Sequence, residues 1–219
     1  MITIPPPELT NQPHPNHALN NDTTLKNTIQ TLIQTYNIRT IIETGTFLGE
    51  TTAYLSTLTP SVHTIEINPF YHSLARTNIT KWINDNTITP TTPPTLHYGP
   101  SSTILPDLIP TLQPPILYYL DAHWEPEHPL LNELETIGRT DNNPIIIIHD
   151  FQVPNTNLKY DFTTSTFNIH GTEGQPLNLQ YIQPYLPPIY KTGYNYTYNN
   201  QDTALGDKIG VIIITPIIT

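Results

Sequence analysis

The 219-residue chain contains no cysteine, which excludes disulfide bonds, thiolate metal sites and a cysteine nucleophile. Basic residues are scarce as well, with 8 lysines and arginines against 18 aspartates and glutamates, so the formal net charge is −10. Sequence-independent binding to nucleic acid needs a basic surface, and so does binding to an anionic membrane. We therefore expect neither nucleic acid nor a membrane as a partner.

Long apolar runs are also missing, since none approaches the roughly 18 residues that span a bilayer. The first seven residues have neither the basic start nor the apolar core of a secretory signal, so we expect a cytoplasmic protein. The length suits one α/β domain. We assign residues 22–219 to it and residues 1–21, rich in Pro, Asn and His, to an irregular N-terminal arm. His14 and His17 in that arm are better interpreted as solvated loop histidines than as a metal pair.

Residues 38–52 predict a buried strand, a tight glycine turn and the first turn of a helix. Ile38, Ile41 and Ile42 are β-branched and apolar, as in a strand that is covered on both faces. Gly45 permits a positive φ, and its missing Cβ lets a ligand approach the main chain. Glu43 adds a negative charge beside the free N–H groups of the helix start. This combination suits a ligand that carries a cation and a carboxylate together.

Four further apolar segments, at residues 62–66, 96–98, 115–121 and 144–151, predict strands that alternate with helical patterns. Residues 189–198 and 210–215 follow as two strands joined by a link of turn-forming residues, and we expect them to pair antiparallel. The order predicts an α/β, doubly wound sheet that is mostly parallel. The segment from residue 152 to 176 has no periodicity, and loops of that length often act as lids or substrate loops.

Acidic residues stand at the carboxyl ends of these strands, where doubly wound sheets bind ligands. Glu66 can accept two hydrogen bonds from a ribose diol. Asp121 and Asp150 can hold a hard divalent cation such as Mg²⁺, which would lower the pKa of a substrate hydroxyl. Alternatively, His123 or His149 removes that proton, because histidine titrates near neutral pH. The simplest alternative is that these acids are only polar strand ends that meet solvent.

Two motifs resemble known families. The spacing Glu-x-Gly-x-x-x-Gly of residues 43–49 resembles the first motif of the seven-stranded S-adenosylmethionine-dependent methyltransferases. Leu-Asp-Ala-His-Trp at residues 120–124, followed by Ile-Ile-His-Asp at 147–150, looks like the metal-dependent O-methyltransferases of the catechol and macrolide-sugar types. The resemblance covers about residues 38–151. It departs at Phe151, where those families often have a third oxygen ligand for the metal.

The resemblance implies a Rossmann-like, seven-stranded sheet with an antiparallel C-terminal strand. It also implies an S-adenosylmethionine-dependent methyltransferase that methylates a small-molecule acceptor, most naturally at oxygen, with or without Mg²⁺. The residues expected to bind the cofactor are Glu43, Thr44, Gly45, Thr46 and Gly49 for the methionine part, Glu66 for the ribose, Ser101 and Ser102 for the adenine side, and Asp121. The residues expected to organise the acceptor are Asp121, His123, His149 and Asp150, with Asp121 and Asp150 as the metal ligands.

Two other functions stay open at this point. One is a methyltransferase-like binding or scaffold protein without turnover, favoured by Pro100 and Phe151, which stand where the families tend to have polar side chains. The other is a transferase that uses the same type of cofactor for aminopropyl transfer. Ser101 and Ser102 have a plain alternative too, as caps of the helix that follows them. The sequence identifies neither the acceptor nor whether the chain forms a homo-oligomer.

Overall fold

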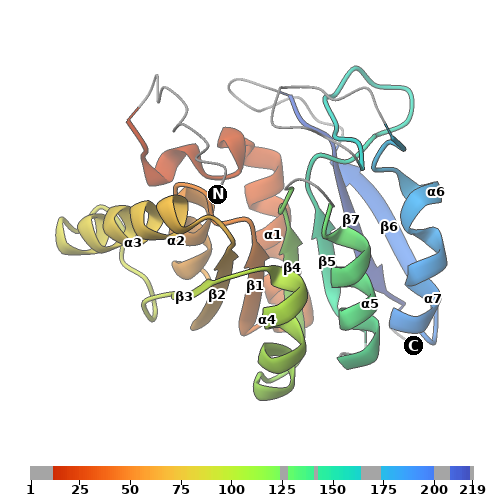
Figure 1. Ribbon diagram of the computed structural model, residues 1–219, viewed down its shortest axis with the longest axis horizontal. Helices are drawn as coiled ribbons and strands as arrows, with labels where there is room; N and C mark the ends of the chain where they lie inside the picture. The colour runs from red at the N-terminus through yellow and green to blue at the C-terminus, as the bar shows by residue number, and fades with distance from the viewer. Residues whose placement is uncertain (1–11, 124–127, 141–142, 164–173, 200–207, 218–219) are drawn as a thin grey trace.

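A computed structural model describes residues 12–123, 128–140, 143–163, 174–199 and 208–217. Within them, a single sheet of seven strands runs through the molecule with helices on both faces (Figure 1). The strands are β1 (Thr40–Thr44), β2 (Ser61–Glu66), β3 (Thr95–Tyr98), β4 (Ile116–Leu120), β5 (Ile145–Ile148), β6 (Tyr194–Asn199) and β7 (Val211–Pro216). Their order across the sheet is β3-β2-β1-β4-β5-β7-β6.

The first five strands pair in parallel, and β7 lies antiparallel to both of its neighbours. This confirms the predicted doubly wound sheet with its antiparallel C-terminal strand. The register aligns the ends of the central strands, because Thr44 pairs with both Ile65 and Leu120, and Leu120 pairs with Ile148. Residues that directly follow these positions therefore meet at one edge of the sheet.

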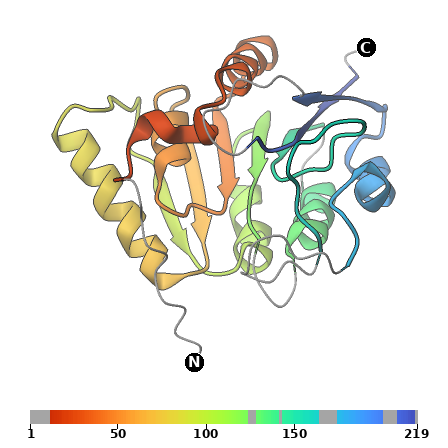
Figure 2. The ribbon, with the colours of Figure 1, turned by 90° about the horizontal axis from the view of Figure 1, so that it is seen from above.

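Helices cover both faces (Figure 2). They are η1 (Pro15–Asn21), α1 (Thr23–Tyr36), α2 (Glu50–Ser56), α3 (Pro69–Asn84), α4 (Ser101–Leu108), η2 (Ile109–Thr111), α5 (Leu130–Thr140), α6 (Leu179–Ile182), η3 (Gln183–Tyr185) and α7 (Leu186–Ile189). Among the described residues, none of these helices has both the length and the apolar character to cross a membrane.

Side chains alternate along the central strands between two apolar cores, as expected for strands covered on both faces. On one face, Tyr118 and Ile146 pack with residues of α4, α5 and α7. On the other, Leu117 and Ile147 pack with residues of α1 and α2. The isoleucine-rich strands thus form the centre of the domain and fix the positions of their ends.

The described part of the N-terminal segment packs against the domain. Residues Pro15–Asn21 form η1, whose backbone is non-helical at Ala18, Leu19 and Asn20. Ala18 and Leu19 are buried, and η1 packs on α2. Because residues 1–11 lie outside the described part of the chain, the irregular arm as a whole stays a prediction.

The carboxylate of Asp22 links two elements that are distant in sequence, α1 and β6. It accepts a hydrogen bond from the N–H of Leu25 at 2.9 Å, which caps α1, and a second one from the side chain of Asn199 in β6. Asp22→Ala removes the cap and leaves a buried amide unpaired. We expect the free energy of unfolding in urea to fall by about 1–3 kcal/mol. Asp107→Ala on the exposed side of α4 is the control, and equal stability of the two variants would contradict this account.

Candidate active site

A cavity of about 430 Å³ opens at the carboxyl ends of β1, β2, β4 and β5. Its lining brings together residues from the strand ends, from η1 and from the loop after β5. The lining residues are Asn20, Gly45, Phe47, Glu66, Tyr71, Asp121, His123, His149, Asp150, Asp161 and Ile209. Six of the predicted site residues, Gly45, Glu66, Asp121, His123, His149 and Asp150, therefore share one cavity.

Gly45 is required by the packing of the main chain. Its φ is +88°, and a Cβ at this position would lie 2.5 Å from the carbonyl oxygen of Asp121. Its N–H donates to the carbonyl of Ile65 at 3.0 Å. The expectation that a ligand uses the space of the missing Cβ is wrong, because the main chain of Asp121, just after β4, occupies that space. Gly45 still lines the cavity beside Asp121.

Glu66 ends β2 and is almost fully buried. One carboxylate oxygen accepts the N–H of Phe47 at 2.9 Å, and the other accepts the N–H of Asn68 at 2.8 Å. Burial raises the pKa of Glu66, and these backbone N–H groups oppose that rise. A carboxylate can accept about four hydrogen bonds, so each oxygen keeps capacity for a ligand hydroxyl.

A second cavity, of about 150 Å³, lies between η1 and the glycine turn. Polar groups line much of it, among them Thr46, Glu50, Thr51 and His17. Thr46 is held by its hydroxyl, which lies 2.6 Å from the hydroxyl of Thr64. The ring of His17 lies 3.1 Å from Glu50 Oε1, and the main-chain N–H of His14 donates to the same oxygen, so both histidines of the arm contact the domain.

Glu43 and Gly49, two residues predicted to bind the cofactor, do not line either cavity. Glu43 is buried beneath the turn, where it accepts a hydrogen bond from the hydroxyl of Thr52. Burial raises the pKa of Glu43 to about 8, although hydrogen bonds from Thr52 and Thr64 oppose the rise. The group is therefore mostly protonated at neutral pH and is not the fixed negative charge that we expected. Gly49 instead allows close packing on α3, since a Cβ there would lie 3.0 Å from Ile79.

The remaining cofactor predictions, Thr44, Ser101 and Ser102, also fall outside the lining of both cavities. Ser102 is exposed, and the cap residue of α4 is Pro100, which makes no side-chain hydrogen bond to the helix. The alternative that one of these serines caps α4 is therefore wrong. The hydroxyls of Ser101 and Thr44 instead act on Glu133, a buried acid of α5 that was not predicted. Burial raises the pKa of Glu133 to about 7, against the effect of these hydroxyls.

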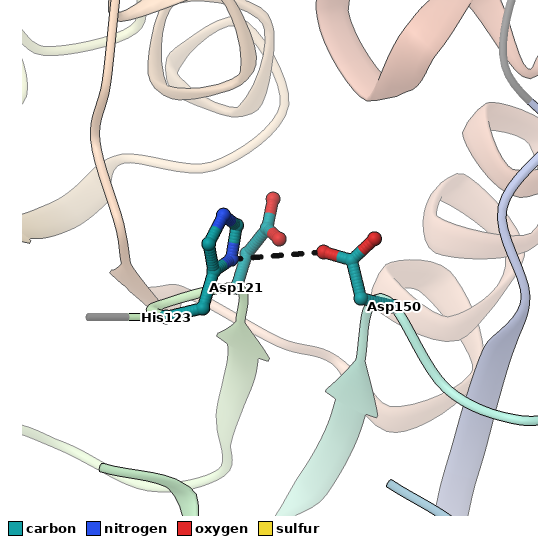
Figure 3. A group of neighbouring side chains, drawn as sticks. All are labelled: Asp121, His123 and Asp150. Atoms are coloured by element: carbon teal, nitrogen blue, oxygen red, sulfur yellow. Dashed lines mark ion pairs between the residues drawn. The ribbon is translucent and has the colours of Figure 1, made fainter. Parts of the chain in front are cut away.

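Asp121, His123 and Asp150 form a compact group at the ends of β4 and β5 (Figure 3). One ligand atom from each side chain lies within 4.8 Å of the others, and His123 Nδ1 lies 3.7 Å from Asp150 Oδ2. Two carboxylates and one imidazole fit a divalent cation. Mg²⁺ prefers oxygen ligands, and Mn²⁺ also accepts a nitrogen ligand.

His149 lies between the two aspartates, with Nδ1 at 3.1 Å from Asp121 Oδ1 and 3.2 Å from Asp150 Oδ2. Burial works to lower the pKa of His149, but both carboxylates outweigh it and raise that pKa well above the ordinary value. His149 and His123 in turn hold the pKa of Asp150 below its usual range, although burial opposes them. The two carboxylates therefore favour the protonated form of the His149 ring, which makes it a poorer base than the sequence suggested.

Asp161 brings a further carboxylate to the cavity and was not predicted. Its N–H donates to the carbonyl of Asp150 and its own carbonyl accepts the N–H of Leu177, both at 2.9 Å. Its carboxylate lies 3.8 Å from His123 Nδ1, and burial raises the pKa of Asp161 to about 6. The resemblance to metal-dependent O-methyltransferases predicted an oxygen ligand directly after Asp150, but that residue is Phe151, which is fully buried. Asp161, ten positions after Phe151, brings an oxygen donor to the cavity instead. Trp124, the last residue of the motif at 120–124, lies outside the described residues.

Burial of Glu43 should make the free energy of unfolding depend on pH. An acid whose pKa is higher in the folded than in the unfolded protein stabilises the fold at low pH, and this contribution is lost as pH rises toward the folded pKa. Wild-type stability should therefore fall between pH 5 and pH 8. Glu43→Gln cannot ionise, and the fall should shrink by at least about 1 kcal/mol, since one unit of pKa shift corresponds to about 1.4 kcal/mol.

Urea unfolding at the two pH values measures this difference. Glu135→Gln on the exposed side of α5 is the control and should retain the wild-type pH dependence. A Glu43→Gln variant with the same pH dependence as the wild type would show that Glu43 is ionised in the folded protein.

No protein-family model matches the chain, and no curated protein matches its sequence. Solved structures do match. The O-methyltransferase TomG from Streptomyces achromogenes, involved in tomaymycin synthesis and solved with S-adenosylmethionine, has a TM-score of 0.58 at 14% identity; the match covers 89% of this chain and 81% of that chain. An O-methyltransferase from Bacillus cereus, solved with S-adenosylhomocysteine, has a TM-score of 0.58 at 16% identity with the same coverage.

An rRNA methylase from Streptococcus thermophilus matches too, with a TM-score of 0.51 at 11% identity over 87% of this chain and 95% of that chain. At these identities the similarity establishes the fold alone. The chain therefore has the Rossmann-like, seven-stranded fold that S-adenosylmethionine-dependent methyltransferases share. The similarity does not identify its substrate.

Proposed function

We propose that the protein is an S-adenosylmethionine-dependent methyltransferase that methylates a small molecule at oxygen. One observation carries the proposal: Gly45, Glu66 and Asp121, which follow or end three different strands, line a single cavity. The shared fold with O-methyltransferases that hold S-adenosylmethionine or its product supports it. A chain without cysteine needs no oxidising compartment in order to fold, which is compatible with activity in the cytoplasm.

The two cavities suit the two ends of the donor. The hydroxyls of Thr46 and Thr51 in the smaller cavity offer hydrogen bonds to the amino acid end. Glu66 in the larger cavity accepts hydrogen bonds from the ribose diol. Phe47 and Tyr71, whose ring centroids are 4.8 Å apart, supply aromatic surface for the adenine and are better placed for it than Ser101 or Ser102.

The acidic group at the ends of β4 and β5 suits the acceptor. Methyl transfer forms a bond from the acceptor oxygen to carbon as the carbon–sulfur bond breaks, and the hydroxyl proton has to leave. Asp161 is ionised at neutral pH and has a pKa of about 6, close enough to neutrality to accept that proton. Asp121, His123 and Asp150 would hold a divalent cation, which would lower the pKa of the acceptor hydroxyl.

The acceptor is proposed to be a small molecule for two reasons. The cavity of about 430 Å³ has to hold part of the donor as well, which leaves room for a compact acceptor. The net charge of −10 opposes binding of nucleic acid, even though an rRNA methylase shares the fold. The charge and the cavity therefore favour a small acceptor over a polynucleotide.

Glu66→Gln tests the donor site. The wild-type protein should bind S-adenosylhomocysteine in calorimetry, and the variant should bind it about 10–100-fold more weakly, because a hydrogen bond to a charged group contributes about 1.5–3 kcal/mol. The melting temperature of the ligand-free variant controls for folding. Glu135→Gln should bind like the wild type, and a wild-type protein that binds neither donor nor product would contradict the proposed function.

Asp150→Asn tests the metal site. Asp150 has a φ of +55°, a backbone conformation that asparagine also adopts, so the variant changes charge with little strain. Mg²⁺ or Mn²⁺ at a hundred times its Kd should raise the wild-type free energy of unfolding by about 2.7 kcal/mol, measured as a rise in melting temperature. The rise should vanish in Asp150→Asn and persist in Asp107→Asn. No rise in the wild type with either ion would leave Asp161 to activate the acceptor without a metal.

A further inference from the structure

The two cavities adjoin, because five residues line both of them. These residues are Asn20, Gly45, Phe47, Asp121 and His149. An elongated ligand with one end in each cavity has to pass between them. Four of the five belong to the glycine turn or to the ends of β4 and β5, and Asn20 alone comes from the N-terminal η1. Asn20 is exposed, and the proposed function gives it no role.

The backbone around Asn20 is strained. Leu19, Asn20 and Asn21 have φ values of 56°, 53° and 59°, so three consecutive residues other than glycine adopt the left-handed conformation. This conformation is costly for leucine and tolerated by asparagine. Such strain persists only where surrounding contacts hold it, and it is concentrated at ligand-binding positions.

Contacts on both sides hold the strained turn against α2, the helix that follows the glycine turn. The N–H of Leu19 donates to Thr51 Oγ1 at 3.2 Å, and the carbonyl of Leu19 accepts the N–H of Asp22 at 2.9 Å. Upstream, the N–H of His14 donates to Glu50 Oε1 at 2.7 Å. Leu19 itself is buried. These contacts hold Asn20 against the start of α2, and it lines both cavities together with Gly45.

We propose that Asn20 contacts the middle of the methyl donor, beside its sulfonium. This inference rests on the proposed function, which assigns the amino acid end of the donor to the smaller cavity and the ribose to Glu66 in the larger one. The sulfur connects these two ends, so it lies where the cavities meet. The carboxamide oxygen of Asn20 carries a partial negative charge and suits a cation at this point.

A pair of glycine variants tests the contact. Glycine adopts the left-handed conformation without steric cost, so Asn20→Gly and Asn21→Gly relieve the strain alike, and only Asn20→Gly removes the carboxamide at the junction. We expect Asn20→Gly to weaken binding of S-adenosylmethionine about 3–10-fold in calorimetry, because a charge–dipole contact comparable in strength to one hydrogen bond is lost. Asn21→Gly should bind like the wild type, and neither variant should melt at a lower temperature without ligand.

A third variant tests the position of the sulfonium. Asn20→Asp keeps the shape and the backbone preference but adds a negative charge, which favours the cationic donor over the neutral product S-adenosylhomocysteine. The ratio of the product Kd to the donor Kd should therefore rise above the wild-type ratio.

An unchanged ratio, or equal affinities of Asn20→Gly and Asn21→Gly, would overturn the inference while the proposed function stands. A wild-type protein that binds neither compound would overturn both.

Discussion

The turn after β1 lies directly against the main chain at the end of β4, and the candidate site depends on this contact. A Cβ on Gly45 would lie 2.5 Å from the carbonyl oxygen of Asp121, and the N–H of Asp121 donates to the carbonyl of Thr44 at 3.0 Å. β1 lies between β2 and β4 in the sheet, where the strand order reverses and doubly wound folds bind ligands. The glycine turn and the acidic group therefore form one rigid unit, which suits a reaction that has to align a donor with an acceptor.

Parallel register concentrates negative charge at this edge, and the structure balances it in several ways. Glu66, Asp121, Asp150 and Asp161 line the larger cavity, and its described lining contains neither lysine nor arginine. His149 supplies a positive charge between two of the aspartates, and burial keeps Glu43 mostly protonated beneath the turn. A cavity with this charge pattern favours ligands that carry positive charge, as a sulfonium and a divalent cation both do.

The sequence predicted the fold and the acids at the strand ends because both follow from local patterns. Isoleucine-rich segments indicate buried parallel strands, and residues at or just beyond the strand ends then belong to a common edge, as Glu66, Asp121 and Asp150 do. Asn20 and Asp161 reach the same cavity from segments without periodicity, so no local pattern placed them there. The environment of Glu43 depends on burial by residues distant in sequence, and its protonation could not be inferred from its position before a glycine turn.

The decisive measurement is a crystal structure of the protein soaked with S-adenosylhomocysteine. We expect continuous density that begins in the smaller cavity beside Thr46, passes Gly45 and Asn20, and ends with the ribose hydroxyls on the carboxylate of Glu66. Density for the compound elsewhere on the protein, with both cavities left to solvent, would contradict this expectation.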